Sequence, residues 1–581
     1  MIGGPLLVRE LLTLPRHIRH FGLRAGYVAA LCVLIYTGAQ TASGLSPMRS
    51  LGDIAHFGAS IFGVICIFQL ALVLGASLLL SAGNVAQEKD RRTLILLLMT
   101  DLRAVELVIG KSLASILPVW VFLVISLPVL CCLRMLGGMT FSQILWVELI
   151  CLVTALVASA WGTLVGYWRE KTFQILAVTI LGAGLFIGLT ETVRSLAGPT
   201  SLVGQIASAC DPFRSLYDVL HPLTLTTEVG VPNVNAWASV VVLSVLAVLQ
   251  WSWTCIMLRV WNPSRAMYLQ TDEYAPKDEA LAPATVASRQ RNVWTHPILW
   301  REICTQAYGR KVGLIKVAYV MFAVFCVLWL SRLPPDAPLV FGTISGIGLV
   351  FVLLSLATLI LVNAQSVTSL TSERDGQTLE LLLVTEITPG EFVYGKLLGV
   401  LFNTKELIAI PLIPIFMYWM RGGLSVGSLI CIIISYVTLV LFSAMLGLHS
   451  GFSFQASKAA ILNSLGTMFF LFVGIFICMM LIVEARTSFL LQLLPFLIFI
   501  LGGSLALGTS LTHQNPSQAL LIAAGVLPFA TFYAVVSFLL GDAPAVCLAI
   551  LGAYGGTTLA MLVPAVSAFD MVLGRTVNDR G

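Results

Sequence analysis

The sequence has 581 residues and a formal net charge of +5; 58% of its residues are hydrophobic and only 10% are charged. About 25% of the residues in a soluble domain are charged, so this composition excludes a soluble protein. Apolar runs of roughly 18 or more residues recur along nearly the whole chain, and each can cross a hydrocarbon core as a helix. We expect an all-α, polytopic integral membrane protein whose partners include the lipid bilayer and no nucleic acid.

The first segment, residues 5–24, combines leucine and isoleucine with arginine and histidine at helical spacing. This pattern predicts a helix that lies in the membrane interface. It returns at 297–316, where Arg301 and Glu302 correspond to Arg9 and Glu10 within a shared Pro-x-Leu-x-Arg-Glu. A basic anchor beside a span is the alternative interpretation, but an anchor needs only charge and not a shared motif.

Six apolar runs follow, at about 26–42, 54–84, 108–135, 141–168, 173–191 and 236–260. We interpret the first as a retained span, because no small-residue cleavage site clearly follows it. Residues 261–296 are polar and contain several prolines, which is typical of a flexible cytoplasmic linker. The sequence thus predicts a first unit at 1–260, a linker at 261–296 and a second unit at 297–581.

The second unit repeats this plan, with runs near 314–331, 339–368, 393–420, 424–450, 459–484 and 544–568. It also carries apolar sequence at 487–510 and 519–540, where the first unit offers only 195–222. Hydropathy leaves open whether this extra pair (487–540) crosses the membrane, so the predicted count is twelve spans, or fourteen. We interpret 195–222 and 519–540 as helices on the outer side.

Basic residues crowd into alternate loops, and this bias sets the orientation of a membrane protein. They precede the first span and follow the second, fourth and sixth spans, for example at Arg16, Arg92, Lys171 and Lys277. Those loops and both termini are therefore predicted to be cytoplasmic. We expect a multi-pass protein of the cell (inner or cytoplasmic) membrane.

One polar stretch between the second and third runs occurs twice. Residues 88–111 read EKDRRTLILLLMTDLRAVELVIGK and residues 373–396 read ERDGQTLELLLVTEITPGEFVYGK, with 12 of 24 positions identical. We call them the first and second elements. The same sequence segment at the same place in two halves indicates an internal duplication. The alternative interpretation is a loop hairpin whose leucines are only structural. It is less favoured, because the Thr, Glu and Gly-Lys residues of the segment are duplicated too.

Each element is predicted to form helix, break, helix. The helix of the second span should continue from Glu88 to Met99, and Asp101 is a candidate cap for the next helix. In the second element, Thr388 begins a Thr-Pro-x-Glu capping box. Glu106 with Gly110, and Glu391 with Gly395, lie four residues apart on one face, where glycine allows close helix approach.

The pattern Glu-x4-Thr-Leu-x-Leu-Leu-x2-Thr, followed by Glu-x3-Gly-Lys, closely resembles the ABC-2 type permeases, the membrane subunits of one class of ATP-driven exporter. The resemblance covers both halves and implies two tandem six-helix domains of the type V exporter kind. It also implies coupling helices at 88–100 and 373–385 that dock on cytoplasmic ABC ATPase subunits, of which we expect two. The interfacial helices, with Arg9, Glu10, Arg301 and Glu302, would assist docking.

By this resemblance the coupling residues are Glu88, Asp90, Arg91, Thr93, Thr100, Glu106, Lys111, Glu373, Asp375, Thr378, Thr385, Glu391 and Lys396. The two copies differ, because Arg92 and Ile95 stand where the second copy has Gln377 and Glu380. We therefore expect the two docking surfaces not to be equivalent. ATP and magnesium would bind the partner subunits and not this chain.

No ATPase motif is present in the sequence. Gly110-Lys111-Ser112 resembles the end of a phosphate-binding loop, but the required glycine five residues earlier is Val105. Most of the 12 cysteines lie within apolar runs, with no CxxC and no cysteine–histidine cluster, so we expect no metal site. We accordingly expect a transport subunit and not an enzyme.

Polar residues inside spans are candidates for a transport path, because a charge buried in lipid is costly. Lys405 and Glu406 lie within the ninth span, and their first-half equivalents are Trp120 and Val121. Either they pair with other helices or they line a substrate path. Charges near the outer ends of spans are expected to be interfacial: Glu148, Glu484, Arg134 and Arg421. Prolines within the third and ninth spans should kink them, either as hinges or to shape the bundle: Pro118, Pro128, Pro411 and Pro414.

The favoured function is a permease that exports a substrate with energy from separate ATPase subunits. The alternative is a secondary transporter of the major facilitator kind, which shares twelve spans and a central linker. Neither a leucine-rich helix with Thr and Glu nor a repeated interface helix is expected there. A polytopic enzyme is less favoured, because the seven histidines are scattered. The resemblance implies export but identifies no substrate.

Overall fold

A computed structural model describes residues 7–8, 12, 18–45, 51–198, 201–221, 236–262, 294, 296–304, 312–332, 345–383, 387–475, 489–513, 517–567 and 569. Every regular element in these ranges is a helix, which confirms the all-α prediction. The helices before the linker are α2 (Ile18–Leu45), α3 (Leu51–Asp90), α4 (Thr93–Met99), α5 (Ala104–Leu133), α6 (Phe141–Trp168), α7 (Thr172–Ala197), α8 (Leu202–Cys210), α9 (Pro212–Leu220) and α10 (Ala236–Trp261).

The helices after the linker include several interrupted ones. They are α12 (Pro297–Cys304), α13 (Val312–Arg332), α14 (Gly346–Asp375), α15 (Thr378–Leu383), α16 (Pro389–Asn403), α17 (Lys405–Ala409), α18 (Leu412–Met420), α19 (Val426–Ser453), α20 (Ser457–Phe469), α22 (Phe489–Leu511), α23 (Gln518–Leu539), α24 (Ala543–Ile550) and α25 (Gly556–Ser567). Two π-helical turns lie at Phe470–Gly474 after α20 and at Leu551–Gly555 between α24 and α25, and a 3-10 turn, Arg134–Leu136, follows α5.

Ten helices of the described residues are long and apolar enough to cross a membrane, or eleven if the bent pair Pro389–Asn403 and Lys405–Met420 is one span. Shorter apolar helices lie at Arg24–Tyr36, Gly313–Leu328 and Phe496–Leu511. The protein is therefore a multi-pass membrane protein. The extra apolar sequence of the second half forms α22 and α23, which pack against each other.

The prediction of a separate interfacial helix at 5–24 is wrong for residues 18–24. Residues 18–24 continue without a break into the first span as α2, because no proline or glycine pair interrupts the helix there. Arg9 and Glu10 lie outside the described residues. Of the second predicted interfacial segment, 297–316, residues 297–304 form the helix α12 and residues 312–316 belong to α13.

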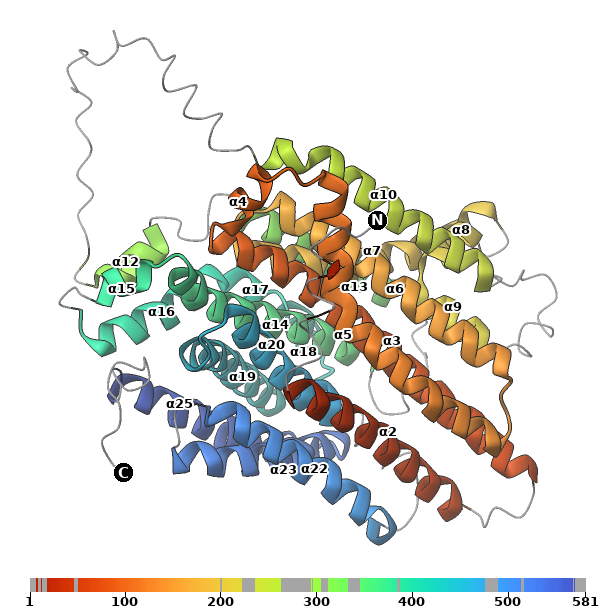
Figure 1. Cartoon of the computed structure of the whole chain (residues 1–581). Helices are drawn as coiled ribbons and strands as arrows, with labels where there is room; N and C mark the ends of the chain where they lie inside the picture. Colours follow the sequence, from red (N-terminus) through yellow and green to blue (C-terminus); the bar gives the residue numbers. More distant parts are fainter. Residues whose placement is uncertain are drawn as a thin grey trace.

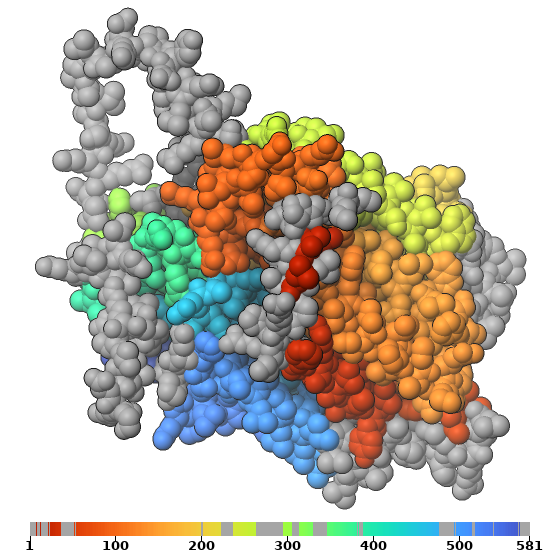
Figure 2. Space-filling model, in the orientation of Figure 1, coloured from red at the N-terminus to blue at the C-terminus, as the bar shows by residue number. Residues whose placement is uncertain are grey.

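The two halves lie side by side, with the orange and yellow helices of the first half against the green and blue helices of the second (Figure 1). Between them, α7 packs against α13 and α14, and α3 packs against α20. One buried cluster contains side chains of both halves, among them Ala82, Leu176, Tyr319 and Leu361. At the chain's beginning, α2 packs against α22 of the other half. The halves therefore share a continuous apolar core, and their surfaces adjoin in the space-filling view (Figure 2).

Within each half the tightest helix pair has the same geometry. A Cβ added at Gly162 of α6 would lie 2.5 Å from Ser81 Oγ and 3.0 Å from Leu78 O of α3. A Cβ added at Gly447 of α19 would lie 2.7 Å from both Ser366 Cβ and Asn363 O of α14. These glycines, and the residues they contact, are 285 positions apart in the sequence. Glycine allows the two backbones to approach this closely.

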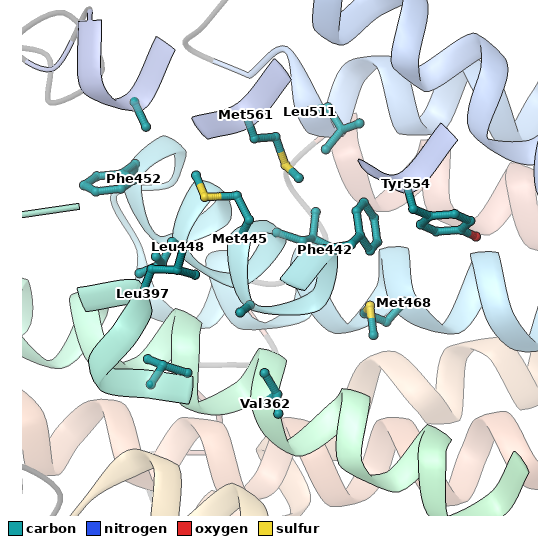
Figure 3. Close-up of a cluster of buried hydrophobic side chains, with 14 of the residues drawn as sticks. Val362, Leu397, Phe442, Met445, Leu448, Phe452, Met468, Leu511, Tyr554 and Met561 are labelled. Atoms are coloured by element: carbon teal, nitrogen blue, oxygen red, sulfur yellow. The ribbon is translucent and has the colours of Figure 1, made fainter. Parts of the chain in front are cut away.

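The core of the second half is rich in aromatic and methionine side chains (Figure 3). Phe442 of α19 meets Tyr554 edge to face, with ring centroids 4.8 Å apart. Met445, Met468 and Met561 fill the remaining space around these rings. This cluster connects α19 and α20 to α24 and α25, which close the second half.

Candidate functional site

Each element starts with a sharp turn rather than a continuous helix. The second span of the first half, α3, ends at Asp90, and Arg92 adopts a left-handed conformation with φ 59°. In the second element Gln377, the corresponding residue, has φ 57°. A left-handed residue cannot continue a right-handed helix, so the predicted helix from Glu88 to Met99 is wrong: it breaks at Arg91 and Arg92.

A threonine hydroxyl stabilises this turn in both copies. Thr93 Oγ1 donates to the carbonyl oxygen of Glu88 at 3.3 Å, and Thr378 Oγ1 donates to that of Glu373 at 3.1 Å. The short helices α4 and α15 then begin. The repeated threonine therefore has a local structural role in ending the span, because its hydroxyl donates a hydrogen bond to one of the helix's C-terminal carbonyl oxygens.

The glutamate and lysine at the two ends of each element form an ion pair. In the first element Lys111 of α5 contacts Glu88 of α3, and their side chains are 14% and 17% exposed. In the second, Lys396 Nζ of α16 lies 2.7 Å from Glu373 Oε1 of α14. The pair fastens the helix that precedes the turn to the helix that follows it, so neither lysine belongs to a phosphate-binding loop.

The second pair belongs to a larger charged network. Lys396 Nζ also lies 2.6 Å from Glu302 Oε1 of α12, and both side chains are only 1% exposed. It donates to the carbonyl oxygen of Ser369 at 3.2 Å. Arg301 pairs with Glu302 and with Glu373. Two cations and two carboxylates thus balance in a buried site, which is the condition for burying charge at an acceptable cost.

Each element is also tied to the next two spans. Lys89 Nζ donates to the carbonyl oxygens of Tyr167 and Arg169, at 2.6 and 2.7 Å, where α6 ends. Arg374 does the same at the end of α19, with the carbonyls of Phe452 and Phe454. A cation at a helix C-terminus satisfies carbonyls that have no partner within the helix and interacts favourably with the helix dipole.

The repeated aspartates complete this attachment. Thr172, at the start of α7, donates a hydrogen bond to Asp90. Ser457, at the start of α20, donates one to Asp375. These contacts comprise the turn, the ion pair and the two attachments. Each residue that makes them in the first half has its counterpart 285 positions later in the second half. One set of contacts therefore recurs in both halves.

One ion pair joins the two elements to each other. Arg91 Nε lies 3.4 Å from Asp375 Oδ1, and the side chains are 47% and 5% exposed. Glycine stands at the position that corresponds to Arg91, namely Gly376. The two elements therefore meet at the boundary between the halves. The ion pair across this boundary has no symmetric counterpart, because the second element has a glycine in place of the arginine.

The helices after the elements start with capping boxes. Glu391 accepts from the backbone N–H of Thr388 at 3.1 Å, and Thr388 Oγ1 accepts from that of Glu391 at 3.3 Å, which confirms the predicted box. In the first copy Glu106 accepts from the backbone N–H of Arg103 at 3.2 Å. The prediction of Asp101 as cap is wrong, because Arg103 occupies the N-cap position of α5.

The short helix α4 exposes apolar side chains. Leu94 is buried, whereas Ile95 is 37% and Leu96 and Met99 are 64% exposed. Thr100 Oγ1 donates to Leu97 O at 2.6 Å and closes the helix. In α15, Leu379 is buried as Leu94 is, and Thr385 lies outside the described residues. Glu88, Lys89, Asp90 and Lys111 thus bond to neighbouring spans, and the exposed apolar side chains of α4 form a ridge, Ile95, Leu96 and Met99.

Lys405 and Glu406 lie at a bend in the ninth predicted span. The two parts of this span make an angle of 62° at Thr404. Glu406 pairs with Lys316 of α13 at 2.9 Å, and Lys405 Nζ lies 4.0 Å from the centroid of the Phe402 ring. Glu406 therefore pairs with a residue of another helix, and Lys405 contacts an aromatic ring one turn before it.

The predicted proline kinks differ between the halves. Pro118 and Pro128 lie inside the continuous helix α5, whereas the bend of the ninth span lies at Thr404, before Pro411. A proline removes the donor to the carbonyl four residues earlier. For Pro411 that carbonyl belongs to Leu407, and the hydroxyl of Thr358 donates to it at 3.0 Å.

Sequence reasoning missed a polar cluster inside the first half. Glu148, expected to be interfacial, accepts hydrogen bonds from Gln69 Nε2 at 3.1 Å and Ser126 Oγ at 2.8 Å. Gln69 and Ser126 are buried. The signal was available, because Gln69 and Ser77 are the two polar residues in the run from Ile61 to Leu80. Within the described ranges, no three or more His, Cys, Asp or Glu side chains could hold a metal ion.

Residues 40–256 match the family model described as ABC-2 family transporter protein. The match runs from the last turns of α2 to α10, so it contains the first element and the spans to which that element is tied. No curated protein matches the chain.

Proposed function

We propose that the chain is the membrane-spanning permease of an ABC exporter, because residues 40–256 match the ABC-2 family transporter model. Separate nucleotide-binding subunits hydrolyse the ATP, and ATP and magnesium bind those subunits. The substrate passes between the two halves of this chain. The alternative is a facilitator driven by an ion gradient, and the family match does not support it.

The observation that carries the proposal is the combination of ties and exposure in the first element. Ion pairs and caps fasten residues 88–111 to α3, α5, α6 and α7. The apolar ridge of α4 stays exposed at the end of this assembly. A subunit that binds the ridge and moves must therefore move four spans with it. An exposed apolar ridge of this kind suits a protein–protein interface.

The chain is proposed to consist of two fused permease units, joined by the linker at 261–296. Support comes from contacts of the first half that recur in the second half between residues numbered 285 higher. The close glycines of α6 and α19 are among them. Two units supply two coupling helices, α4 and α15, and we propose one ATPase subunit for each. The two docking surfaces differ in sequence, because Arg91 and Ile95 stand where the second unit has Gly376 and Glu380.

The basic loops place α4, α15 and both termini in the cytoplasm under this proposal, with the protein in the cytoplasmic membrane. That is the side on which ATP is available. The loops at the opposite ends of the spans include Arg134–Leu136 after α5. Met135 in that turn is 90% exposed and provides a control position far from the elements.

The test is copurification of an ATPase subunit from native membranes, with bound proteins identified by mass spectrometry. Leu96→Asp with Met99→Asp should reduce recovery of the ATPase subunit about tenfold, since an interface anchor contributes at least 1.4 kcal/mol. Met135→Asp, the same change at the opposite end, should leave recovery unchanged. Purified chain that transports cargo on an ion gradient without any ATPase subunit would refute the proposal.

A further inference from the structure

A cavity of about 230 Å³ lies inside the first half, apart from both elements. It is enclosed by α3, α6, α7 and α10 and reaches the junction of α8 and α9. Its walls are almost entirely apolar and include Leu78, Val157, Trp161, Leu185, Ile187 and Leu243. At the edge of the cavity, Leu189 is 60% exposed, so the cavity is accessible from the lipid side of α7.

Four positions that line the cavity correspond to larger side chains in the second half. Residues displaced by 285 positions from Val157, Ala183, Leu185 and Ile187 are Phe442, Met468, Phe470 and Phe472. All four belong to or pack against the core of that half, and Figure 3 shows Phe442 and Met468 converging there.

The filling is tight. Phe472 stacks on Tyr554 with centroids 5.9 Å apart, and Phe470 lies 5.7 Å from Phe499 of α22. Large side chains therefore occupy these positions in the second half, whereas the first half has smaller side chains at the same four positions. An empty apolar cavity destabilises a fold in proportion to its volume, and apolar cavities of this kind stay dry and bind hydrocarbon.

One wall of the cavity is polar. The side chain of Gln250 on α10 lines it, and its Oε1 is buried without a hydrogen-bond partner among the described residues. The hydroxyl of Thr154, which also lines the cavity, already donates to Ile150 O at 2.7 Å. A buried acceptor without a donor is costly, and a ligand that donates one hydrogen bond next to an apolar chain would satisfy it.

We propose that this cavity binds the hydrocarbon chain of an amphiphile and that Gln250 Oε1 accepts a hydrogen bond from a hydroxyl or amide at the start of the chain. The bilayer is the source of such molecules, and the exposed edge at Leu189 is their entry. The site does not depend on coupling to an ATPase, so it can be tested on the purified chain.

The experiment uses the full chain in lipid nanodiscs with a long-chain fatty alcohol that carries a diazirine in its chain. After illumination, mass spectrometry locates the adducts. In the unaltered protein we expect adducts on peptides that contain Val157, Ile187 and Leu243. Val157→Phe with Ile187→Phe, which introduces the residues of the second half, should abolish them. Val248→Phe, on a 56% exposed position of α10, should not.

The polar contact has its own readout. Gln250→Leu should weaken labelling by the fatty alcohol about tenfold, the change expected when a hydrogen bond of roughly 1.4 kcal/mol is lost. Labelling by the corresponding diazirine alkane should stay the same. Adducts on lipid-exposed peptides serve as the internal check that each variant is folded in the membrane, and Ala183→Met alone provides a milder filling.

Three results would overturn the proposal. One is labelling of the cavity peptides no stronger than that of the filled core around Phe442. The second is labelling that persists in both filled variants. The third is an equal loss of alcohol and alkane labelling in Gln250→Leu, which would mean that this residue only shapes the wall.

Discussion

The two elements share one set of contacts but are buried to different degrees. In the second, Lys396 is 1% exposed and pairs both with Glu373, which is 16% exposed, and with the buried Glu302 of α12. In the first, Lys111 and Glu88 are 14% and 17% exposed, and the neighbouring helix α4 carries an exposed apolar ridge. The contacts that both elements share attach each element to its spans. The contacts and exposed side chains that differ determine which surface each element offers to a partner.

The largest effect should come from breaking the buried network. Lys396→Met leaves Glu302 and Glu373 with one cation fewer, and we expect a loss of about 3–5 kcal/mol of stability. Lys111→Met, at the more exposed pair, should cost only about 1 kcal/mol. Thermal unfolding of the purified variants in detergent, followed by gel filtration, measures both. Equal losses would contradict the difference in burial that separates the elements.

The close glycines test what the halves have in common. A side chain at Gly162 or at Gly447 would meet the backbone of the preceding span at 3.0 Å or less. Gly162→Val and Gly447→Val should therefore each destabilise the protein by about 1–3 kcal/mol, and by similar amounts. Gly466→Val is the control, since nothing lies within 4 Å of a Cβ there. If only one of the two variants is destabilised, the halves are not packed alike.

A smaller effect is expected at the helix starts. Thr388→Ala removes the side-chain acceptor of the capping box and should cost about 1 kcal/mol. Arg103→Ala should have less effect, because Glu106 accepts from the backbone N–H of that residue, which the substitution keeps. Unfolding midpoints of the two variants provide the comparison, and a larger loss for Arg103→Ala would refute this account of the caps.

The smallest change in stability is expected where the elements meet. Arg91→Ala breaks an ion pair whose arginine is 47% exposed, and exposed pairs contribute at most about 1 kcal/mol. We nevertheless expect it to alter the response of the halves to ATPase binding, because it is a direct contact between the elements. Stability within about 1 kcal/mol of the unaltered protein, with reduced ATP hydrolysis in the reconstituted complex, is the expected pair of results. Unchanged hydrolysis would remove Arg91 from the coupling.

Much of the fold followed from the sequence because lipid imposes long apolar helices. The run at 141–168 coincides with α6, and the capping box at Thr388 is present. Local conformation was harder to predict. The left-handed Arg92 and Gln377 have no glycine to signal them, and the bend at Thr404 does not lie at a proline. The partners of Lys89 and Arg374 are carbonyls on distant helices, which a linear pattern does not contain.

The cavity of the first half was also beyond sequence reasoning. Val157 and Ile187 are ordinary residues for a span, and only the packing of α6 and α7 against Leu243 of α10 leaves a space between the helices. Once the two halves are aligned, however, Phe442 and Phe472 at the matching positions reveal the difference. Comparing the halves therefore gives information that neither gives alone.

Hydrogen–deuterium exchange tests the central claim, that α4 and α15 are the surfaces on which the ATPase acts. The chain is compared in nanodiscs with and without the bound ATPase subunits. We predict protection concentrated at residues 91–101 and 376–383, with no change at Arg134–Leu136 on the opposite side. Binding that leaves both segments unprotected, or that protects the opposite side, would contradict the account.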